Sequence, residues 1–184
     1  MKITNIIEHL KSRDVDFTRT NCIVDEENCI ADFFLYNLTG QIIGYQRYNP
    51  NGSKANHSNK LSKGDMKYYT YITKNDRFPM LAVYGLETYT HTDKYLFITE
   101  GIFDCIKLHN QGLPAIAVIA NNPSPLKSWL RTLPQIKVVV KDNDGLAGDM
   151  LSKFGDIVLT PPDPYKDLGD MPFDEVYKLV GNVI

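Results

Sequence analysis

The chain has 184 residues, which is enough for one domain or for two small domains that share an interface. Its 43% hydrophobic and 23% charged residues are typical of a folded globular protein and not of a disordered or membrane protein. The formal net charge of -2 gives no overall attraction to nucleic acid, so any basic surface has to come from local clustering of lysine and arginine.

The first half of the sequence predicts a short helix followed by strands. Apolar residues recur at helical spacing near the start, at Ile3, Ile6, Ile7 and Leu10. Segments 30–35 and 41–48 predict two strands, with turn residues from Asn37 to Gly40 between them. The polar segment 49–65 predicts a long loop, and 67–72 and 80–84 predict further strands. We therefore expect residues 1–93 to form a small, mostly antiparallel α+β subdomain.

From residue 94 the pattern changes to an alternation of buried strands and helices. Strands are predicted at 95–98, 115–119, 136–140 and 156–159, and helices at 102–110, 125–133, 146–154 and 172–180. Gly112 and Gly155 stand where two of these helices are expected to end. Short connections between alternating strands and helices are typical of a parallel sheet. We expect an α/β domain at residues 94–184.

Acidic residues follow two of the predicted buried strands. Glu100 comes just after the strand 95–98, and Asp142 and Asp144 follow the strand 136–140. Ligands of open α/β sheets bind beyond the carboxyl ends of the strands, and residues two apart in an extended segment point to the same side. If the two strands are neighbours, three carboxylates converge. Mg²⁺ (or Mn²⁺) is the cofactor we expect there, because it prefers oxygen ligands and offsets their repulsion.

Two further acidic residues are candidate metal ligands. Asp104 lies in the first turn of the predicted helix 102–110, where it either binds a second metal or complements the helix N-terminus; taken alone, the second role is favoured. Asp167, with Asp170, follows the last predicted strand and either extends the acidic patch or belongs to a solvated turn. For Asp142 and Asp144 the alternative is a polar turn that closes a buried strand.

Two motifs resemble those of Toprim domains. Glu100-Gly101-Ile102-Phe103-Asp104 resembles their E-G-x-x-D motif, and D-N-D-G-L-A-G at 142–148 resembles their D-x-D-G-x-A-G motif. Toprim domains occur in bacterial-type and phage primases, in topoisomerases and in a group of nucleases. The resemblance covers roughly the last half of the chain. It implies a Toprim-type parallel sheet in which Glu100, Asp142 and Asp144 bind catalytic magnesium.

The first half is similar, more loosely, to the N-terminal part of the primase RNA-polymerase core. The similarity rests on the stretch G-Q-I-I-G-Y-Q-R-Y at 40–48 and on Lys67-Tyr68-Tyr69 followed by Y-G-L-E at 84–87. It implies a phage-like DNA replication protein that makes RNA primers. The expected partners are a single-stranded DNA template and nucleoside triphosphates.

Basic residues cluster between residues 47 and 77, and tyrosines interleave with them. Basic side chains neutralise phosphates, and aromatic faces stack on unpaired bases. Beside an acidic site this pattern favours a template or nucleotide track; the alternative is a solvated loop with core aromatics. The residues predicted to contact nucleic acid or nucleotides are Arg47, Lys54, Lys60, Lys63, Lys67 and Tyr68.

Modules that accompany many bacterial-type primases have no counterpart in this sequence. The three cysteines lack C-x-x-C spacing and the four histidines fit no metal spacing with them, so no zinc is predicted. The helicase loop G-x-x-x-x-G-K-[ST] is also absent. A helicase or another replication protein is therefore an expected partner. With no membrane-length apolar run and no signal segment, we expect a cytoplasmic protein, bacterial or in an infected host, with no membrane partner.

Two other functions remain compatible with the same residues. A Toprim nuclease would use the same metals to cleave DNA rather than to synthesise a primer. A non-catalytic Toprim protein would bind nucleic acid or the replisome, although clustered carboxylates that bind nothing destabilise a fold by repulsion. Topoisomerase action is disfavoured, because it needs a tyrosine placed for covalent attack and the tyrosines here are predicted in strands.

Overall fold

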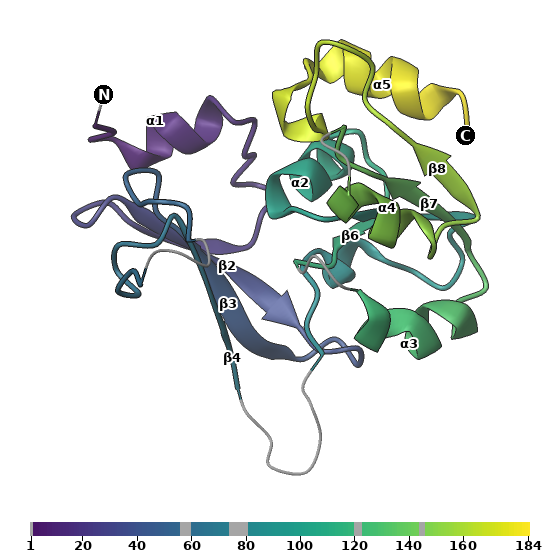
Figure 1. Ribbon diagram of the computed structural model, residues 1–184, viewed down its shortest axis with the longest axis horizontal. Coiled ribbons are helices and arrows are strands. Elements are labelled where there is room, and N and C mark those ends of the chain that lie inside the picture. Colours follow the sequence, from purple (N-terminus) through teal and green to yellow (C-terminus); the bar gives the residue numbers. More distant parts are fainter. Residues whose placement is uncertain (1, 56–59, 74–80, 120–122, 144–145) are drawn as a thin grey trace.

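The computed structural model describes residues 2–55, 60–73, 81–119, 123–143 and 146–184. The described chain forms two sheets, each of four strands (Figure 1). The first is antiparallel, in the order β1-β2-β3-β4, and the second is parallel, in the order β6-β5-β7-β8. The predicted fold class, a parallel α/β domain preceded by a mostly antiparallel α+β unit, is confirmed.

The antiparallel unit begins with helix α1 (Ile6–Lys11), whose first turn is capped by the side chain of Asn5. The strands are β1 (Cys22–Asp25), β2 (Ile30–Tyr36), β3 (Ile42–Tyr48) and β4 (Tyr68–Ile72). The turn between β2 and β3 is tight because Gly40 adopts a positive φ of 83° and the Asn37 side chain accepts backbone hydrogen bonds from Thr39 and Gln41.

The parallel unit alternates strands with helices, as its sequence predicts. Its strands are β5 (Tyr95–Thr99), β6 (Ala115–Ala117), β7 (Ile136–Val140) and β8 (Ile157–Leu159). Its α-helices are α2 (Ile102–Asn110), α3 (Lys127–Thr132), α4 (Leu146–Ser152) and α5 (Phe173–Gly181). Short 3-10 turns occur at η1 (Leu86–Thr88), η2 (Ser124–Leu126) and η3 (Leu168–Asp170). None of the helices in the described ranges could cross a membrane.

Successive residues of the parallel strands are buried on opposite faces of the sheet. Phe97 and Val138 belong to a core that also contains the inner residues of α2 and α5. Leu96 and Val139 belong to a second core, with residues of α3 and α4. The continuous apolar run of β5 is thus explained by helices that cover both faces.

The first of these cores continues into the antiparallel sheet. The ring of Phe33, on β2, packs edge-on against Phe103 of α2, at 5.7 Å between ring centroids, and against Tyr84 at 6.1 Å. Tyr48, on β3, also packs edge-on against Phe103, at 4.9 Å. The two sheets therefore share one hydrophobic core, and this core holds the antiparallel sheet beside the first turn of α2.

Two predictions of local structure are wrong, and one strand was not predicted. The strand expected at 80–84 is reduced to isolated bridges, from Val83 to Tyr36 and from Tyr84 to Ala117, because this segment joins one sheet to the other. The strand expected at 115–119 ends at Ala117, and Ile119 has a positive φ of 49°. The edge strand β1 has no counterpart in the prediction. The predicted domain boundary at 93/94 lies between η1 and β5 and stays a prediction. Part of the predicted loop at 49–65, residues 56–59, lies outside the described residues.

We expect Phe33→Ala to lower the free energy of unfolding by about 3–5 kcal/mol, the usual range for truncating a buried phenylalanine. Phe33 is 1% exposed, and its ring contacts residues of both units. Because the core is shared, urea denaturation of the variant, followed by circular dichroism and by fluorescence, should show a single transition at a lower urea concentration than in the wild-type protein. Phe173→Ala, which truncates a ring that is 51% exposed, is the control and should change stability little. Two separate transitions would contradict the shared core.

Candidate functional site

The carboxyl ends of two central strands bring acidic residues together. β5 and β7 are hydrogen-bonded parallel neighbours, with Ile98 opposite Val139, which meets the condition on which the predicted site depends. Glu100 follows β5 and Asp142 follows β7, so both emerge at the same edge of the sheet. They line one cavity, together with Asp104 and Asp167. Asp144, the third member of the predicted triad, lies outside the described residues.

Asp104 is the most deeply buried of these acids, with 9% of the residue exposed. Burial, and then the neighbouring charges of Asp167 and Asp142, raise its pKa from 3.8 to about 7. Its Oδ1 accepts a hydrogen bond of 2.8 Å from the backbone N–H of Gly169 in η3. Asp104 is thus more than a charge at a helix N-terminus, because it connects α2 to the turn that carries Asp167.

The loop that carries Asp167 is attached to the end of β7. The backbone N–H of Asn143 donates to the carbonyl of Lys166 at 2.7 Å, which brings Asp167 beside Asp142. The Asp167 side chain caps η3 by accepting from the backbone N–H of Asp170 at 3.0 Å. Asp170 itself is exposed and does not line the cavity.

Gly101 leaves the space that the Asp104 carboxylate occupies. A Cβ atom at residue 101 would lie 2.7 Å from Asp104 Oδ2, which is closer than a carbon and an oxygen can approach without a shift of one of them. A side chain at the glycine of the E-G-x-x-D motif would therefore displace the Asp104 carboxylate from its present position.

Arg13 is a site residue that the sequence prediction missed. Its guanidinium carbon lies 3.7 Å from the centroid of the Phe103 ring, and the guanidinium donates a 3.5 Å hydrogen bond to Tyr48 Oη. The next residue, Asp14, forms an ion pair with the buried Lys107 of α2, and this pair holds the segment in place. The positive charge of Arg13 acts to lower the Asp104 pKa, opposing the larger effect of burial. A lone arginine after a short helix carried no sequence signal for this role.

Two predicted basic residues lie near Arg13, and one of them, Lys54, lines the cavity that holds the acids. Lys54 lines the same cavity as Glu100 and Asp142. Burial, and then the charges of Arg13 and Lys54, lower the pKa of Lys67, which shows that the three cations are close to one another. We call Arg13, Lys54 and Lys67 the basic rim. It borders an acidic cavity, so charges of both signs face the same space.

The other predicted nucleic-acid contacts are divided between the two faces of the antiparallel sheet. Tyr68 lines the acidic cavity. Arg47 follows Gln46 in β3 and so points to the opposite face, where it makes two 2.8 Å hydrogen bonds to Asp32. Lys63 lies over the Tyr69 ring, with Nζ 5.4 Å from its centroid, and Lys60 is exposed. Of the predicted residues that the structure describes, Lys54 and Tyr68 line the cavity, whereas Arg47, Lys60, Lys63 and Lys67 do not.

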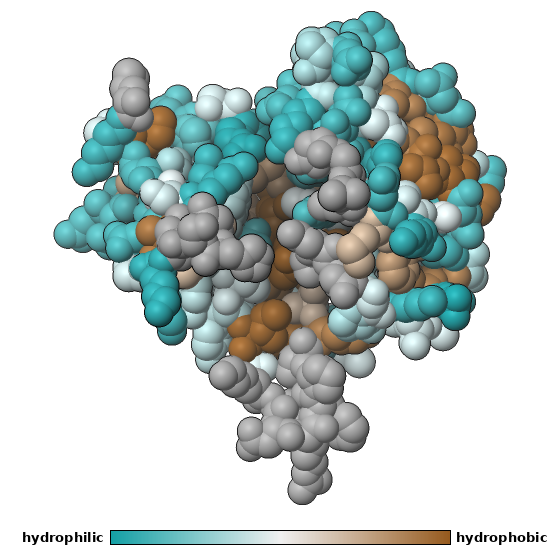
Figure 2. Space-filling model, viewed as in Figure 1, coloured by the Kyte–Doolittle hydropathy of each residue, from teal (hydrophilic) through white to brown (hydrophobic). Residues whose placement is uncertain are grey.

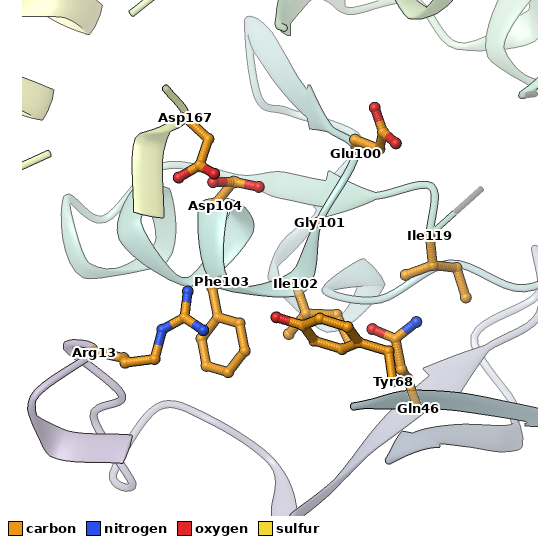
Figure 3. A pocket seen from close by; sticks show the side chains of 10 residues that line it. All are labelled: Arg13, Gln46, Tyr68, Glu100, Gly101, Ile102, Phe103, Asp104, Ile119 and Asp167. Carbon is orange, nitrogen blue, oxygen red and sulfur yellow. The ribbon is translucent and has the colours of Figure 1, made fainter. Parts of the chain in front are cut away.

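The acidic cavity continues into an adjoining pocket, whose side chains lie on distinct sides (Figure 3). The residues that line both are Tyr68, Glu100, Gly101, Asp104 and Asp167. The carboxylates of Asp104 and Asp167 face each other, whereas the Glu100 carboxylate points away from them. Arg13 and Phe103 lie on a second side, and Tyr68, Gln46 and Ile119 lie on a third.

The donor chemistry of the acidic side fits a divalent cation. Four carboxylates supply the hard oxygen ligands that Mg²⁺ prefers. The pKa of Asp104 is raised by burial and then by the charges of Asp167 and Asp142, and a cation would relieve the repulsion from those two charges. Within the described part of the chain, no three potential ligands are close enough to hold a metal as they stand. Ion binding would therefore require a rearrangement, such as a turn of the Glu100 side chain toward the other acids.

The architecture is that of primase catalytic cores. No protein-family model and no curated protein sequence matches the chain. The primase fragment of the bacteriophage T7 primase-helicase protein is similar with a TM-score of 0.57 and 14% identity, over 90% of this chain and 78% of that one. The RNA polymerase domain of Mycobacterium tuberculosis primase DnaG is similar with a TM-score of 0.57 and 15% identity, over 95% and 65%.

A third solved structure, the DnaG primase catalytic domain bound to ssDNA, has a TM-score of 0.53 and 17% identity, over 84% of this chain and 49% of that one. This chain thus spans about half the length of that domain. The predicted resemblance to a Toprim-type primase core is confirmed at the level of the fold.

We expect Asp104→Asn to stabilise the protein more at pH 8 than at pH 5. A carboxyl whose pKa rises on folding, here from 3.8 to about 7, binds more protons in the folded state, so its contribution to stability is lost as the pH rises through that range. Asparagine does not titrate and can still accept from Gly169. At about 1.4 kcal/mol per pH unit, the two pH values should differ by on the order of 2–3 kcal/mol.

Urea denaturation at both pH values, with EDTA present, measures this difference. Asp174→Asn, which changes an exposed carboxylate of α5, is the control and should show little pH dependence of its effect. An equal effect of Asp104→Asn at pH 5 and pH 8 would contradict the raised pKa.

Proposed function

We propose that this protein is a magnesium-dependent nucleotidyltransferase that synthesises RNA primers on a single-stranded DNA template. The observation that carries the proposal is the convergence of Glu100, Asp104, Asp142 and Asp167 on one cavity at the carboxyl ends of β5 and β7, in a chain with the fold of primase cores. The basic rim at the border of this cavity adds binding capacity for phosphates.

In this proposal the acidic side of the cavity holds the metal. Glu100, Asp142 and Asp144 would be the ligands, and Asp104 and Asp167 would add negative charge or complete a second site. A bound Mg²⁺ would neutralise the charge of the triphosphate and orient the reacting oxygens. Glu100 and Asp142 come shortly after buried strands and Asp104 lies in the first turn of a helix, so regular secondary structure positions these carboxylates.

The basic rim has a separate role in binding. Arg13 presents a planar guanidinium that is held against the Phe103 ring, and Lys54 and Lys67 present ammonium groups beside it. Together they would bind the triphosphate and the template backbone. Burial, and then repulsion from Arg13 and Lys54, lower the Lys67 pKa, and a bound phosphate would relieve the repulsion.

The likeness to solved structures supports the class of partner. One similar domain is a DnaG catalytic domain bound to ssDNA, and another is part of the T7 primase-helicase protein. For this chain we propose the same classes of partner, a single-stranded DNA template and a helicase or other replication protein.

We expect the purified protein, with single-stranded DNA, four nucleoside triphosphates and Mg²⁺, to make short oligoribonucleotides. Glu100→Gln and Asp142→Asn should each lower the rate by at least about 100-fold, because even residues that only support metal ligands cost up to that much. Asp174→Asn, which changes an exposed carboxylate outside the cavity, should keep the activity. Circular dichroism checks that all three variants are folded.

Incubation with labelled DNA in the same buffer separates the other functions. Cleavage of the DNA without synthesis would replace the proposal with a Toprim nuclease, and DNA binding with neither reaction would replace it with a non-catalytic module. Full activity of both acidic variants would refute the metal site.

The position of the basic rim predicts that some of the basic residues bind single-stranded DNA and that others do not. Lys54→Ala and Lys67→Ala should each weaken binding of a labelled single-stranded oligonucleotide and reduce the slope of log K against log salt by about 0.7, the value for one lost phosphate contact. Arg47→Ala should leave the slope unchanged, because Arg47 lies on the other face of the sheet in an ion pair with Asp32. Lys178→Ala, an exposed lysine of α5, is the control. Fluorescence anisotropy at several salt concentrations measures the slopes, and equal slopes for Arg47→Ala and Lys67→Ala would contradict the division.

A further inference from the structure

The third side of the cavity, opposite the carboxylates, is formed by Tyr68, Gln46 and Ile119 (Figure 3). These side chains carry no net charge, in contrast to the acidic side and the basic rim. We propose that they form a nucleobase subsite in which Tyr68 and Ile119 pack against the base of the incoming nucleotide and Gln46 distinguishes one base from another. This inference rests on the proposed function and specifies how its substrate is recognised.

Ile119 is held in a backbone conformation that isoleucine rarely adopts. Its φ of 49° lies in the left-handed region, which is disfavoured for a β-branched residue. Two hydrogen bonds of 3.0 Å impose the conformation, from the N–H of Ile119 to the carbonyl of Glu100 and from that of Val118 to the carbonyl of Thr99. Conformations of this kind persist where the surrounding structure determines them, and they are concentrated at functional sites. Here the result is an apolar side chain on the wall of a largely charged cavity.

Tyr68 supplies a flat surface on the same side of the cavity. The Tyr68 ring packs against Tyr48, at 5.4 Å between ring centroids, and the residue is 37% exposed, so part of the ring is accessible to a ligand. An aromatic face stacks on any base, whereas an aliphatic side chain contacts a base by apolar packing. A tyrosine ring and an isoleucine side chain beside a metal-type acidic cluster therefore fit a planar base whose phosphates lie toward the charged groups.

Gln46 adds the polar group that can distinguish one base from another. Its Nε2 donates a 3.0 Å hydrogen bond to Thr70 Oγ1 on β4, directly across the β3–β4 pair, and this contact orients the amide. Among the described residues the amide makes no other hydrogen bond. One N–H and the carbonyl oxygen are thus left for a ligand, and such a donor and acceptor pair matches the edge of a base.

The experiment measures equilibrium binding of each of the four ribonucleoside triphosphates, and of inorganic triphosphate, in the presence of Mg²⁺. Inorganic triphosphate has no base and reports only on the charged sides of the cavity. We expect the wild-type protein to bind nucleoside triphosphates more tightly than inorganic triphosphate and to prefer some bases over others.

Gln46→Leu keeps the size of the side chain and removes the amide. We expect it to weaken binding of the preferred nucleotide by about threefold to tenfold, the effect of one hydrogen bond, and to reduce the preference among bases. Ile119→Gly keeps the backbone conformation without penalty and removes the apolar wall, so it should weaken binding of all four nucleotides by about fourfold or more. Neither change should affect inorganic triphosphate.

Gln41→Leu and Ile23→Ala are matched controls, because both residues are exposed and neither lines the cavity. They should leave every affinity unchanged. Thermal unfolding of each variant checks that the fold is intact. An unchanged base preference in Gln46→Leu, or wild-type protein that binds inorganic triphosphate as tightly as every nucleotide, would overturn the inference.

Failure of the inference is distinguishable from failure of the proposed function, because binding is measured without synthesis. Primer synthesis with base preferences that survive both substitutions would overturn the subsite alone. Base-dependent binding that needs Gln46, in a protein that makes no primer, would overturn the primase proposal and leave the subsite standing.

Discussion

The packing of Phe103 between the two sheets is the contact on which the site depends. Phe103 lies between Gly101 and Asp104 in the first turn of α2, and its ring packs against aromatic residues of β2 and β3. This contact holds the antiparallel sheet beside the carboxyl edge of the parallel sheet. As a result, side chains of both units line the same cavity (Figure 2 shows the hollow between them). Without the shared core, the carboxylates would face solvent with no basic rim beside them.

The cavity brings together an acidic cluster and a basic cluster. Each cluster alone is unfavourable because its like charges repel, and the two together are favourable. Burial and like charges raise the Asp104 pKa to about 7, and burial and like charges lower the Lys67 pKa. Each cluster concentrates one sign of charge. A ligand that carries both a divalent cation and phosphates relieves both repulsions, and a metal–nucleotide complex is such a ligand. The electrostatics of the cavity therefore support nucleotide chemistry more specifically than an acidic cluster alone.

Much of the site could be predicted because its residues lie in short local motifs. Glu100, Gly101 and Asp104 are within five residues of one another, and strand and helix periodicity placed them at the end of β5 and the start of α2. The long-range contributors were harder to predict. Arg13 reaches the site from the N-terminal segment, and Gln46 and Arg47 are adjacent in sequence but point to opposite faces of β3. Packing decides which face of a strand lies toward a distant domain, and the local composition of the strand does not reveal it.

The sequence by itself determined the alternation of buried strands and helices, the two acidic motifs and the enrichment of lysine and tyrosine in the first half. These features follow from local periodicity and local residue chemistry. Only the tertiary structure decided that β5 and β7 are neighbours, that Tyr68 faces the acids while Arg47 does not, and that Ile119 is held in a left-handed conformation on the cavity wall. The reason is that strand order, sheet face and an imposed φ angle are set by contacts between residues far apart in the chain, and such contacts form only when the core packs.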